Sequence, residues 1–211
     1  MRCIDLTLPV TGKPRDPDTV RLEEWPIRMG AVSYTGMVYR FAHGSMAGTY
    51  IDFPGHIKET DDGTDALNVP IERLYRVPAV VLRLDRADGS GRISAAELQT
   101  ACPEQPSGGA LVLNALGTRR FDEIRERSVY LGKDAVQWIV RTGVHLFVSD
   151  VYESNDDPQG VFQDLFGAGI STVCCPVNLH ELTAPTAKVT AFPLRMAKVT
   201  QLPCRLVAEL D

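Results

Sequence analysis

The sequence lacks the features that mark membrane, secreted and nucleic-acid-binding proteins. No apolar stretch is long enough to span a bilayer. The first residues carry an acid at the fifth position and no long apolar run, so we expect no secretion signal. The 22 Lys and Arg are scattered among 27 Asp and Glu, giving a net charge of −5 and no basic stripe. We therefore expect neither a membrane nor a nucleic acid as partner.

Cysteine is also sparse. The five cysteines are an odd number, and their spacing makes neither a disulfide framework nor a Cys-x-x-Cys metal site. Repeats, low-complexity tracts and glycine-rich phosphate loops are missing as well. These absences favour a cytoplasmic protein. With 211 residues, 44% of them hydrophobic and 23% charged, the chain fits one globular domain spanning residues 1–211.

Hydrophobic periodicity predicts strands that alternate with helices. Nearly continuous apolar runs predict buried strands at 77–84, 109–115, 144–150 and 170–175. Further strands are expected at 4–9, 32–41, 189–194 and 205–210. Because several strands are adjacent, the expected fold class is α/β (mixed α+β), with a central mixed sheet flanked by helices.

Helix and turn signals complete this pattern. Ser94 and Glu97 form a capping box that opens a helix running to about Ala101. Other helical segments are expected at 71–74, 121–127, 133–142 and 161–168. Three prolines among many charges predict a surface loop over 10–28, and Gly36 predicts a turn inside 32–41.

The densest group of chemically active side chains lies at 48–56, which reads Gly-Thr-Tyr-Ile-Asp-Phe-Pro-Gly-His. Tyr50, Asp52 and His56 bring a phenol, a carboxylate and an imidazole into seven residues. In an extended run they share one face, and a kink at Pro54 would bring the imidazole over the carboxylate. A neighbouring carboxylate orients an imidazole for acid-base work. An ordinary strand end, with Asp52 capping a turn, is the alternative.

Other reactive side chains are more simply explained by structure. His145 lies in an apolar run and His43 ends a strand, so both are expected to be structural. His180 lies in a turn-like segment, and an acid-base role for it stays open. Cys174 ends a buried strand, either as a small hydrophobic side chain or as a thiol that faces a pocket.

Residues 46–56 resemble the His-x-Gly-Thr-His-x-Asp-x-Pro-x-His signature of a cyclase superfamily that includes kynurenine formamidases, isatin hydrolases and polyketide cyclases. The resemblance extends over nearly the whole chain, with further landmarks at 4–7, 77–84, 130–150, 167–170 and 178–179. It implies the swivelling β/β/α cyclase-like fold with a barrel-like core. It also implies a small-molecule substrate and a homodimer or homotetramer.

The departures from the signature concern metal binding. Family hydrolases hold two divalent metals through two His and the Asp of the signature, plus a later His and Glu. Here Asp52 is retained, but Met46 and Tyr50 replace the two signature histidines. The later His and Glu fall near Phe162 and Cys174. One carboxylate is too few for a metal site, so we expect no metal and no other cofactor.

Three hypotheses follow from the resemblance. The first is a metal-independent hydrolase or cyclase/lyase, with Asp52 and His56 as general acid and base and Tyr50 as a donor to a carbonyl or oxyanion. It would hydrolyse an amide, ester or lactone, or cyclise or dehydrate a carbonyl compound. The second is a non-catalytic protein that binds a small molecule on the same fold.

The third is a metal-dependent hydrolase that holds zinc or manganese through Asp52 and His56, with Cys174 and His180 as further ligands. All three place the same segment at a pocket. The side chains expected to contact a substrate there are Thr49, Phe53, Cys174 and His180.

Overall fold

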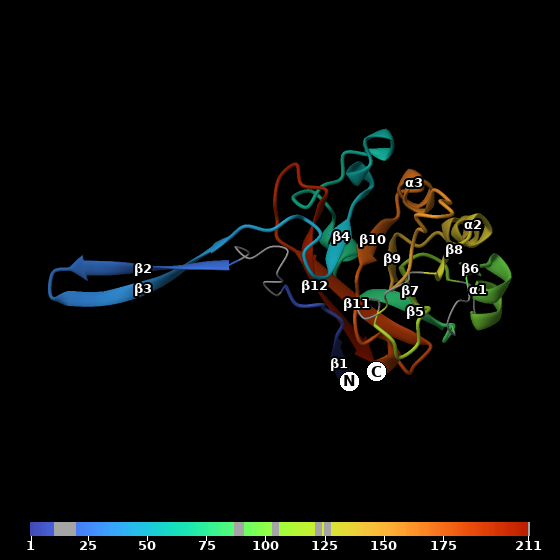
Figure 1. Ribbon diagram of the computed structural model, residues 1–211, viewed down its shortest axis with the longest axis horizontal. Helices are drawn as coiled ribbons and strands as arrows, with labels where there is room; N and C mark the ends of the chain where they lie inside the picture. The colour runs from blue at the N-terminus through green and yellow to red at the C-terminus, as the bar shows by residue number, and fades with distance from the viewer. Residues whose placement is uncertain (11–19, 87–90, 103–105, 121–123, 125–127, 211) are drawn as a thin grey trace.

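Seven strands close into a barrel of mixed direction in this computed structural model, which describes residues 1–10, 20–86, 91–102, 106–120, 124 and 128–210 (Figure 1). In barrel order they are β12 (Gln201–Leu210), β11 (Thr186–Pro193), β5 (Val77–Arg83), β7 (Ala110–Asn114), β9 (Leu146–Ser149), β10 (Ser171–Cys174) and β4 (Tyr50–Asp52). β4 pairs back onto β12 and closes the ring.

Four neighbouring strands of the barrel are parallel, and the other three pair antiparallel with their neighbours. β5, β7, β9 and β10 run in one direction, whereas β4, β11 and β12 pair antiparallel with their neighbours. β1 (Arg2–Asp5) extends the sheet along β12. The predicted α/β (mixed α+β) class, with a barrel-like sheet flanked by helices, is confirmed.

Alternation along the strands divides the core in two. Ile51, Val112 and Val173 belong to the cluster inside the barrel. Leu111 and Leu113 belong to a second cluster under the helices, which lie together on one side of the barrel (Figure 1). These helices are α1 (Ala95–Ala101), α2 (Lys133–Arg141) and α3 (Val161–Gly167). Side chains next to Ile51 and Val173 in sequence therefore point outward, on the face where the polar cluster described below is found.

Helix α1 begins at the capping box that the sequence predicts. The Ser94 hydroxyl accepts from the Glu97 amide at 3.3 Å, and the Glu97 carboxylate accepts from the Ser94 amide at 2.9 Å, which is the predicted capping box.

The remaining elements are short. They are the 3₁₀ turns η1 (Pro54–His56), η2 (Lys58–Thr60), η3 (Ile71–Arg73) and η4 (Leu179–Glu181) and the strands β6 (Arg92–Ile93) and β8 (Tyr130–Leu131). The predicted helix at 121–127 lies mostly outside the described residues. No helix in the described part of the chain is long and apolar enough to cross a bilayer.

The predicted surface loop at 10–28 is wrong from residue 20 onward, and residues 11–19 lie outside the description. β2 (Val20–Met29) and β3 (Val32–Phe41) form a long hairpin that projects from the barrel (Figure 1). Pro26 is tolerated because a two-stranded ribbon consists of edge strands. Gly36 is not in a turn but in mid-strand opposite Trp25.

Candidate active site

The segment 48–56 is held in an irregular shape by close backbone contacts. Gly48 has a φ of +67°, and a Cβ there would lie 2.5 Å from the Leu8 carbonyl oxygen. A Cβ at Gly55 would lie 2.7 Å from the Asp61 carboxylate. After Asp52 the strand gives way to η1, which the Thr60 hydroxyl fastens by donating to the Pro54 carbonyl at 2.7 Å. The predicted kink is therefore present, while the extended run stops at Asp52.

Asp52 is buried on the outer face of the barrel between two strands. It is 2% exposed and lies opposite Thr172 on β10 and Gln201 on β12. Its Oδ2 has two long contacts, with the Thr172 hydroxyl at 3.4 Å and the Cys174 thiol at 3.7 Å. Its Oδ1 is buried and has no hydrogen-bond partner among the described residues. A buried carboxylate oxygen without a partner is costly, and this makes it a candidate for chemistry.

Burial raises the pKa of Asp52 above its usual value. The Gln201 amide, the His56 imidazole, the Cys174 thiol and the Thr172 hydroxyl each oppose that rise. Burial thus favours the protonated form of Asp52, and its polar neighbours favour the ionised form.

Gln201 links the carboxylate to the imidazole. Its amide nitrogen lies 3.1 Å from Nε2 of His56, which places the ring proton on Nδ1. Its amide oxygen accepts from the Ser45 hydroxyl, which fixes the orientation of the amide. Gln201 is buried, whereas His56 is exposed at the rim. Gln201 thus lies beside both Asp52 and His56, and no direct hydrogen bond between the carboxylate and the imidazole is found in the described residues. The joint role of Asp52 and His56 stays a prediction.

Tyr50 and Cys174 face each other across β4 and β10. The two side chains are close enough for each to affect the pKa of the other. Burial raises the pKa of both groups, so the phenol and the thiol are neutral at neutral pH. Tyr50 is accordingly a hydrogen-bond donor, and the neutral thiol of Cys174 is a poor nucleophile.

A row of aromatic rings forms one side of the cluster. The Phe166 ring lies edge-on to His56 with centroids 6.3 Å apart, and Phe162 follows at 5.8 Å from Phe166. Tyr152 stacks on Phe162 at 5.1 Å and donates its hydroxyl to the Val173 carbonyl at 2.8 Å. The polar groups around Asp52 therefore adjoin an aromatic wall.

Thr49 and Phe53 have structural contacts. The Thr49 hydroxyl donates to the Cys175 carbonyl at 2.8 Å and accepts from the Leu8 amide at 2.7 Å. Phe53 is fully buried in the core inside the barrel. A contact of either side chain with a substrate stays a prediction.

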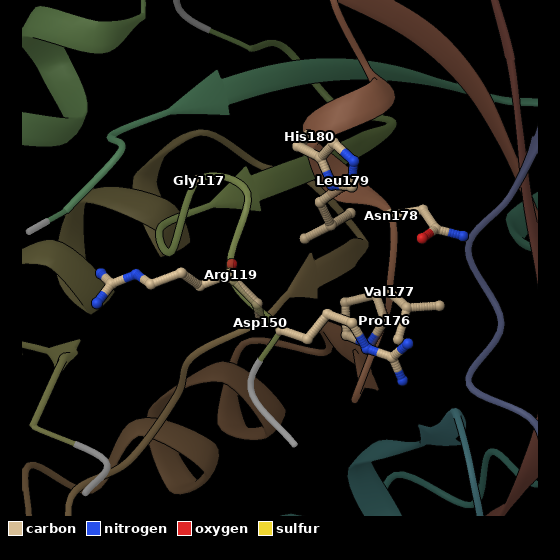
Figure 2. A pocket seen from close by; sticks show the side chains of 9 residues that line it. Gly117, Arg119, Asp150, Pro176, Val177, Asn178, Leu179 and His180 are labelled. Carbon is tan, nitrogen blue, oxygen red and sulfur yellow. The ribbon is translucent and has the colours of Figure 1, made fainter. Parts of the chain in front are cut away.

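His180 lies in a different surrounding. It is on η4 and lines a narrow pocket with Asp150 and Arg119, at the ends of strands β7, β9 and β10 (Figure 2). Asp150 is not available there, because its two oxygens accept from the Ala115 and Leu116 amides at 2.9 Å each.

The donor set around Asp52 does not fit a pair of divalent metals. Met46 is 64% exposed and offers only a thioether, Phe162 has no donor atom, and Tyr50 and Cys174 offer a phenol and a thiol in place of imidazole and carboxylate. Asp52 remains the one hard ligand of the five positions. Within the described ranges, no three or more His, Cys, Asp and Glu side chains are grouped so that they could hold a metal.

Sequence reasoning missed Gln201, Ser45 and Thr172. Gln201 and Ser45 are 156 residues apart and meet only because β12 closes the barrel beside β4. The pattern at the C-terminus predicted a strand from 205, four residues too late to include Gln201. The only available signal was that Gln201 is a polar residue at the start of an apolar strand.

Comparison with solved structures finds the same fold in several hydrolases. Isatin hydrolase A from Labrenzia aggregata, bound to benzyl benzoate, is 18% identical with a TM-score of 0.74, over 99% of this chain and 93% of that one. Isatin hydrolase A from Ralstonia solanacearum is 18% identical with a TM-score of 0.72, over 100% and 92%. A predicted metal-dependent hydrolase from Bacillus stearothermophilus is 18% identical with a TM-score of 0.70, over 98% and 97%.

A comparison with curated protein sequences finds no match. The family model described as "Putative cyclase" matches residues 4–155, which is more than half of the chain and contains the segment 48–56. The chain therefore belongs to the cyclase family.

Proposed function

We propose that this chain is a metal-independent hydrolase or cyclase/lyase that acts on a small carbonyl compound by proton transfer at Asp52 and His56. The observation that carries the proposal is the buried Oδ1 of Asp52, for which no hydrogen bond of good geometry is found in the described residues, although the Gln201 amide lies near enough to lower the pKa of the carboxyl group. A carboxylate with free accepting capacity takes a proton from a water or a substrate.

The neighbouring groups supply the other parts of a hydrolytic step. Water attacks the carbonyl carbon while its proton moves to Asp52, and the neutral Tyr50 phenol donates to the oxygen on which negative charge develops. The proton then passes to the leaving nitrogen or oxygen as its bond to carbon breaks. Transfer of that proton to the leaving group returns Asp52 to its ionised form. His56 is exposed and its ring is positioned by the Gln201 amide, where it can exchange a proton with solvent or with the substrate.

The aromatic row favours a substrate with a planar ring. Phe166, whose ring lies edge-on to His56, is buried, and Phe162 next to it is partly exposed, so the accessible part of Phe162 would contact such a ring. The similarity to isatin hydrolases in fold makes isatin, a cyclic aromatic amide, the first compound to test. Small aromatic lactones, esters and open-chain amides complete the panel.

The test is turnover of this panel by the full chain and by two variants, Asp52→Asn and His56→Gln. We expect measurable turnover by the wild type and a loss of about 100-fold or more in kcat for each variant, the usual contribution of a general acid or base. Asp156→Asn is the matched control, because Asp156 is exposed on a loop. Full activity in Asp52→Asn would overturn the proposal.

The binding-protein alternative gives a different result. A non-catalytic protein would show a thermal shift with members of the panel and form no product with any of them. In that case Asp52→Asn would change ligand affinity alone.

A further inference from the structure

The loops beyond the carboxyl ends of β5 and β7 take no part in the site around Asp52. Asp52 lies opposite Thr172, the second residue of β10, so its cluster is beside the start of the parallel strands. In sheets and barrels of parallel strands, ligands commonly bind in the loops at the carboxyl ends. This edge of the barrel is therefore a place to expect a second ligand.

A hollow of about 420 Å³ opens between these two loops. Arg83, Asp85 and Arg86 line it from the end of β5, and Thr118 and Arg119 line it from the loop after β7. Arg119 also lines the pocket of Figure 2, so the two are neighbours. The volume of the hollow is in the range of small-molecule sites.

Three arginines surround this hollow, although the chain as a whole has a net charge of −5. The Arg119 guanidinium donates to the Leu116 carbonyl at 3.4 Å and to the Arg86 carbonyl. The Arg86 guanidinium in turn is paired with Glu97. Guanidinium groups that the fold holds in place are preorganised donors, and their paired N–H groups match the oxygens of carboxylates and phosphates.

The backbone on both sides of the hollow is left-handed. Asp85 has a φ of +47°, and Gly117 has a φ of +67°. A Cβ at Gly117 would lie 2.8 Å from the Asp85 carboxylate, so the two turns are packed closely together. Non-glycine residues with a left-handed backbone are uncommon and cluster at functional sites. The conformation of Asp85 therefore supports a binding role for this edge.

Arg83 is the accessible cation here, and it connects the hollow to a second one. It is exposed and, in the described part of the chain, has no hydrogen bond or ion pair. The second hollow, of about 460 Å³, is also lined by Arg83. Its apolar lining comes from the end of β5 and from α1, through Leu84, Ala96 and Ala101. A cationic hollow thus adjoins a more apolar one.

We propose that these two hollows form a second ligand site, which binds a small oxyanion with an apolar part, such as a carboxylate or a phosphate monoester attached to a ring. The oxyanion lies in the first hollow against Arg83, Arg119 and the Thr118 hydroxyl, and the apolar part lies in the second. The site shares no residue with the cluster around Asp52, and the proposal does not depend on the proposed function.

The test is calorimetric titration of the full chain with benzoate and phenyl phosphate at constant ionic strength, and with benzyl alcohol as the neutral counterpart. We expect millimolar or tighter binding of at least one oxyanion and none of benzyl alcohol; the oxyanion that binds identifies the charged group. Arg83→Gln should weaken binding about tenfold or more, as loss of a charge-assisted hydrogen bond does. Arg141→Gln, exposed at the end of α2 and outside both hollows, is the matched control and should bind like the wild type.

Asp85→Asn should have the opposite effect. It removes a negative charge from the hollow, and asparagine tolerates the left-handed backbone as aspartate does, so oxyanion affinity should rise about threefold or more. Thr118→Val, at an exposed position, should also weaken binding and replaces Arg83→Gln if circular dichroism shows that the latter fails to fold.

Three results would each overturn the proposal. They are the absence of binding by both oxyanions, weaker binding in Asp85→Asn, and unchanged affinity in a folded Arg83→Gln. The last is the result expected if the oxyanion binds at the Asp52 cluster instead.

Discussion

Two aspartates on the same barrel have opposite surroundings. Asp150 follows β9, and both of its oxygens accept backbone amides at 2.9 Å. Asp52 ends β4, and its Oδ2 has only the long contacts with Thr172 and Cys174 while its Oδ1 has no partner in the described structure. Desolvation raises the pKa of both carboxyl groups, to about 6 for Asp150.

The difference lies in how the hydrogen-bonding capacity is used. Both oxygens of Asp150 accept hydrogen bonds that join the end of β9 to the loop after β7, so the role of Asp150 is structural. Asp52 has one oxygen without a hydrogen bond of good geometry inside a buried polar cluster, and such an arrangement costs stability. Groups of that kind are retained at functional sites. A shifted pKa alone would not separate the two residues, whereas the hydrogen bonds do.

The largest expected effect is on turnover in Asp52→Asn. Activity should fall by about 100-fold to 10,000-fold, while the free energy of unfolding stays nearly the same, because asparagine has the same shape and removes only the ionisable group. Kinetics and urea denaturation of the same preparation measure both quantities. A clear loss of stability with activity retained would reverse the roles assigned to Asp52 and Asp150.

Asp150→Ala should show the converse. Two backbone amides at Ala115 and Leu116 lose their acceptors, and each buried donor left unsatisfied costs about 1–3 kcal/mol. We expect a loss of about 3 kcal/mol in the free energy of unfolding, read from the denaturation midpoint. If the free energy of unfolding is unchanged, the hydrogen bonds of Asp150 do not stabilise the connection between the ends of β7 and β9.

Gln201→Leu tests the link between Asp52 and His56. The Gln201 amide opposes the rise in the pKa of Asp52, so its removal should raise that pKa further. Since the ionised form accepts the proton, activity rises with pH through this pKa, and the rising limb of the pH–rate profile should move to higher pH. We expect kcat to fall about tenfold, within the lower range of acid-base effects. Gln201→Glu retains the size of the side chain and is the matched comparison. A variant with unchanged pH–rate profile would show that Gln201 only fills space.

The smallest effect concerns the pH dependence of stability. The folded-state pKa of Asp150 is raised, so the stability that its proton contributes is fully present below the unfolded value of 3.8 and is lost as pH rises through about 6. The free energy of unfolding should therefore fall between these two pH values. Asp150→Asn should flatten that part of the curve, as followed by denaturation at several pH values. If the free energy of unfolding of Asp150→Asn still falls with pH in this range, another titrating group is responsible for the fall.

The barrel strands were predictable because they are buried on both faces. Runs such as 77–84 and 109–115 are continuously apolar for that reason, and they formed β5 and β7. The kink after Asp52 was also predictable, since proline and two glycines at fixed positions allow few backbone shapes.

The β2–β3 hairpin and the contact of Gln201 with His56 were not predictable from local pattern. β2 and β3 expose both faces and mix charges with apolar side chains, so β2 resembles a polar loop. Gln201 reaches His56 through barrel closure, in which Gln201 pairs with Asp52, 149 residues earlier in the chain. Local sequence carries little information on such contacts.

The most direct test of a metal-independent acid-base site is turnover before and after metal removal. Protein purified without chelator is assayed on the substrate panel, dialysed against EDTA, assayed again, and analysed for zinc and manganese. The account predicts the same kcat before and after dialysis, and its loss in Asp52→Asn. Loss of activity on dialysis, with recovery on adding zinc or manganese, would contradict it.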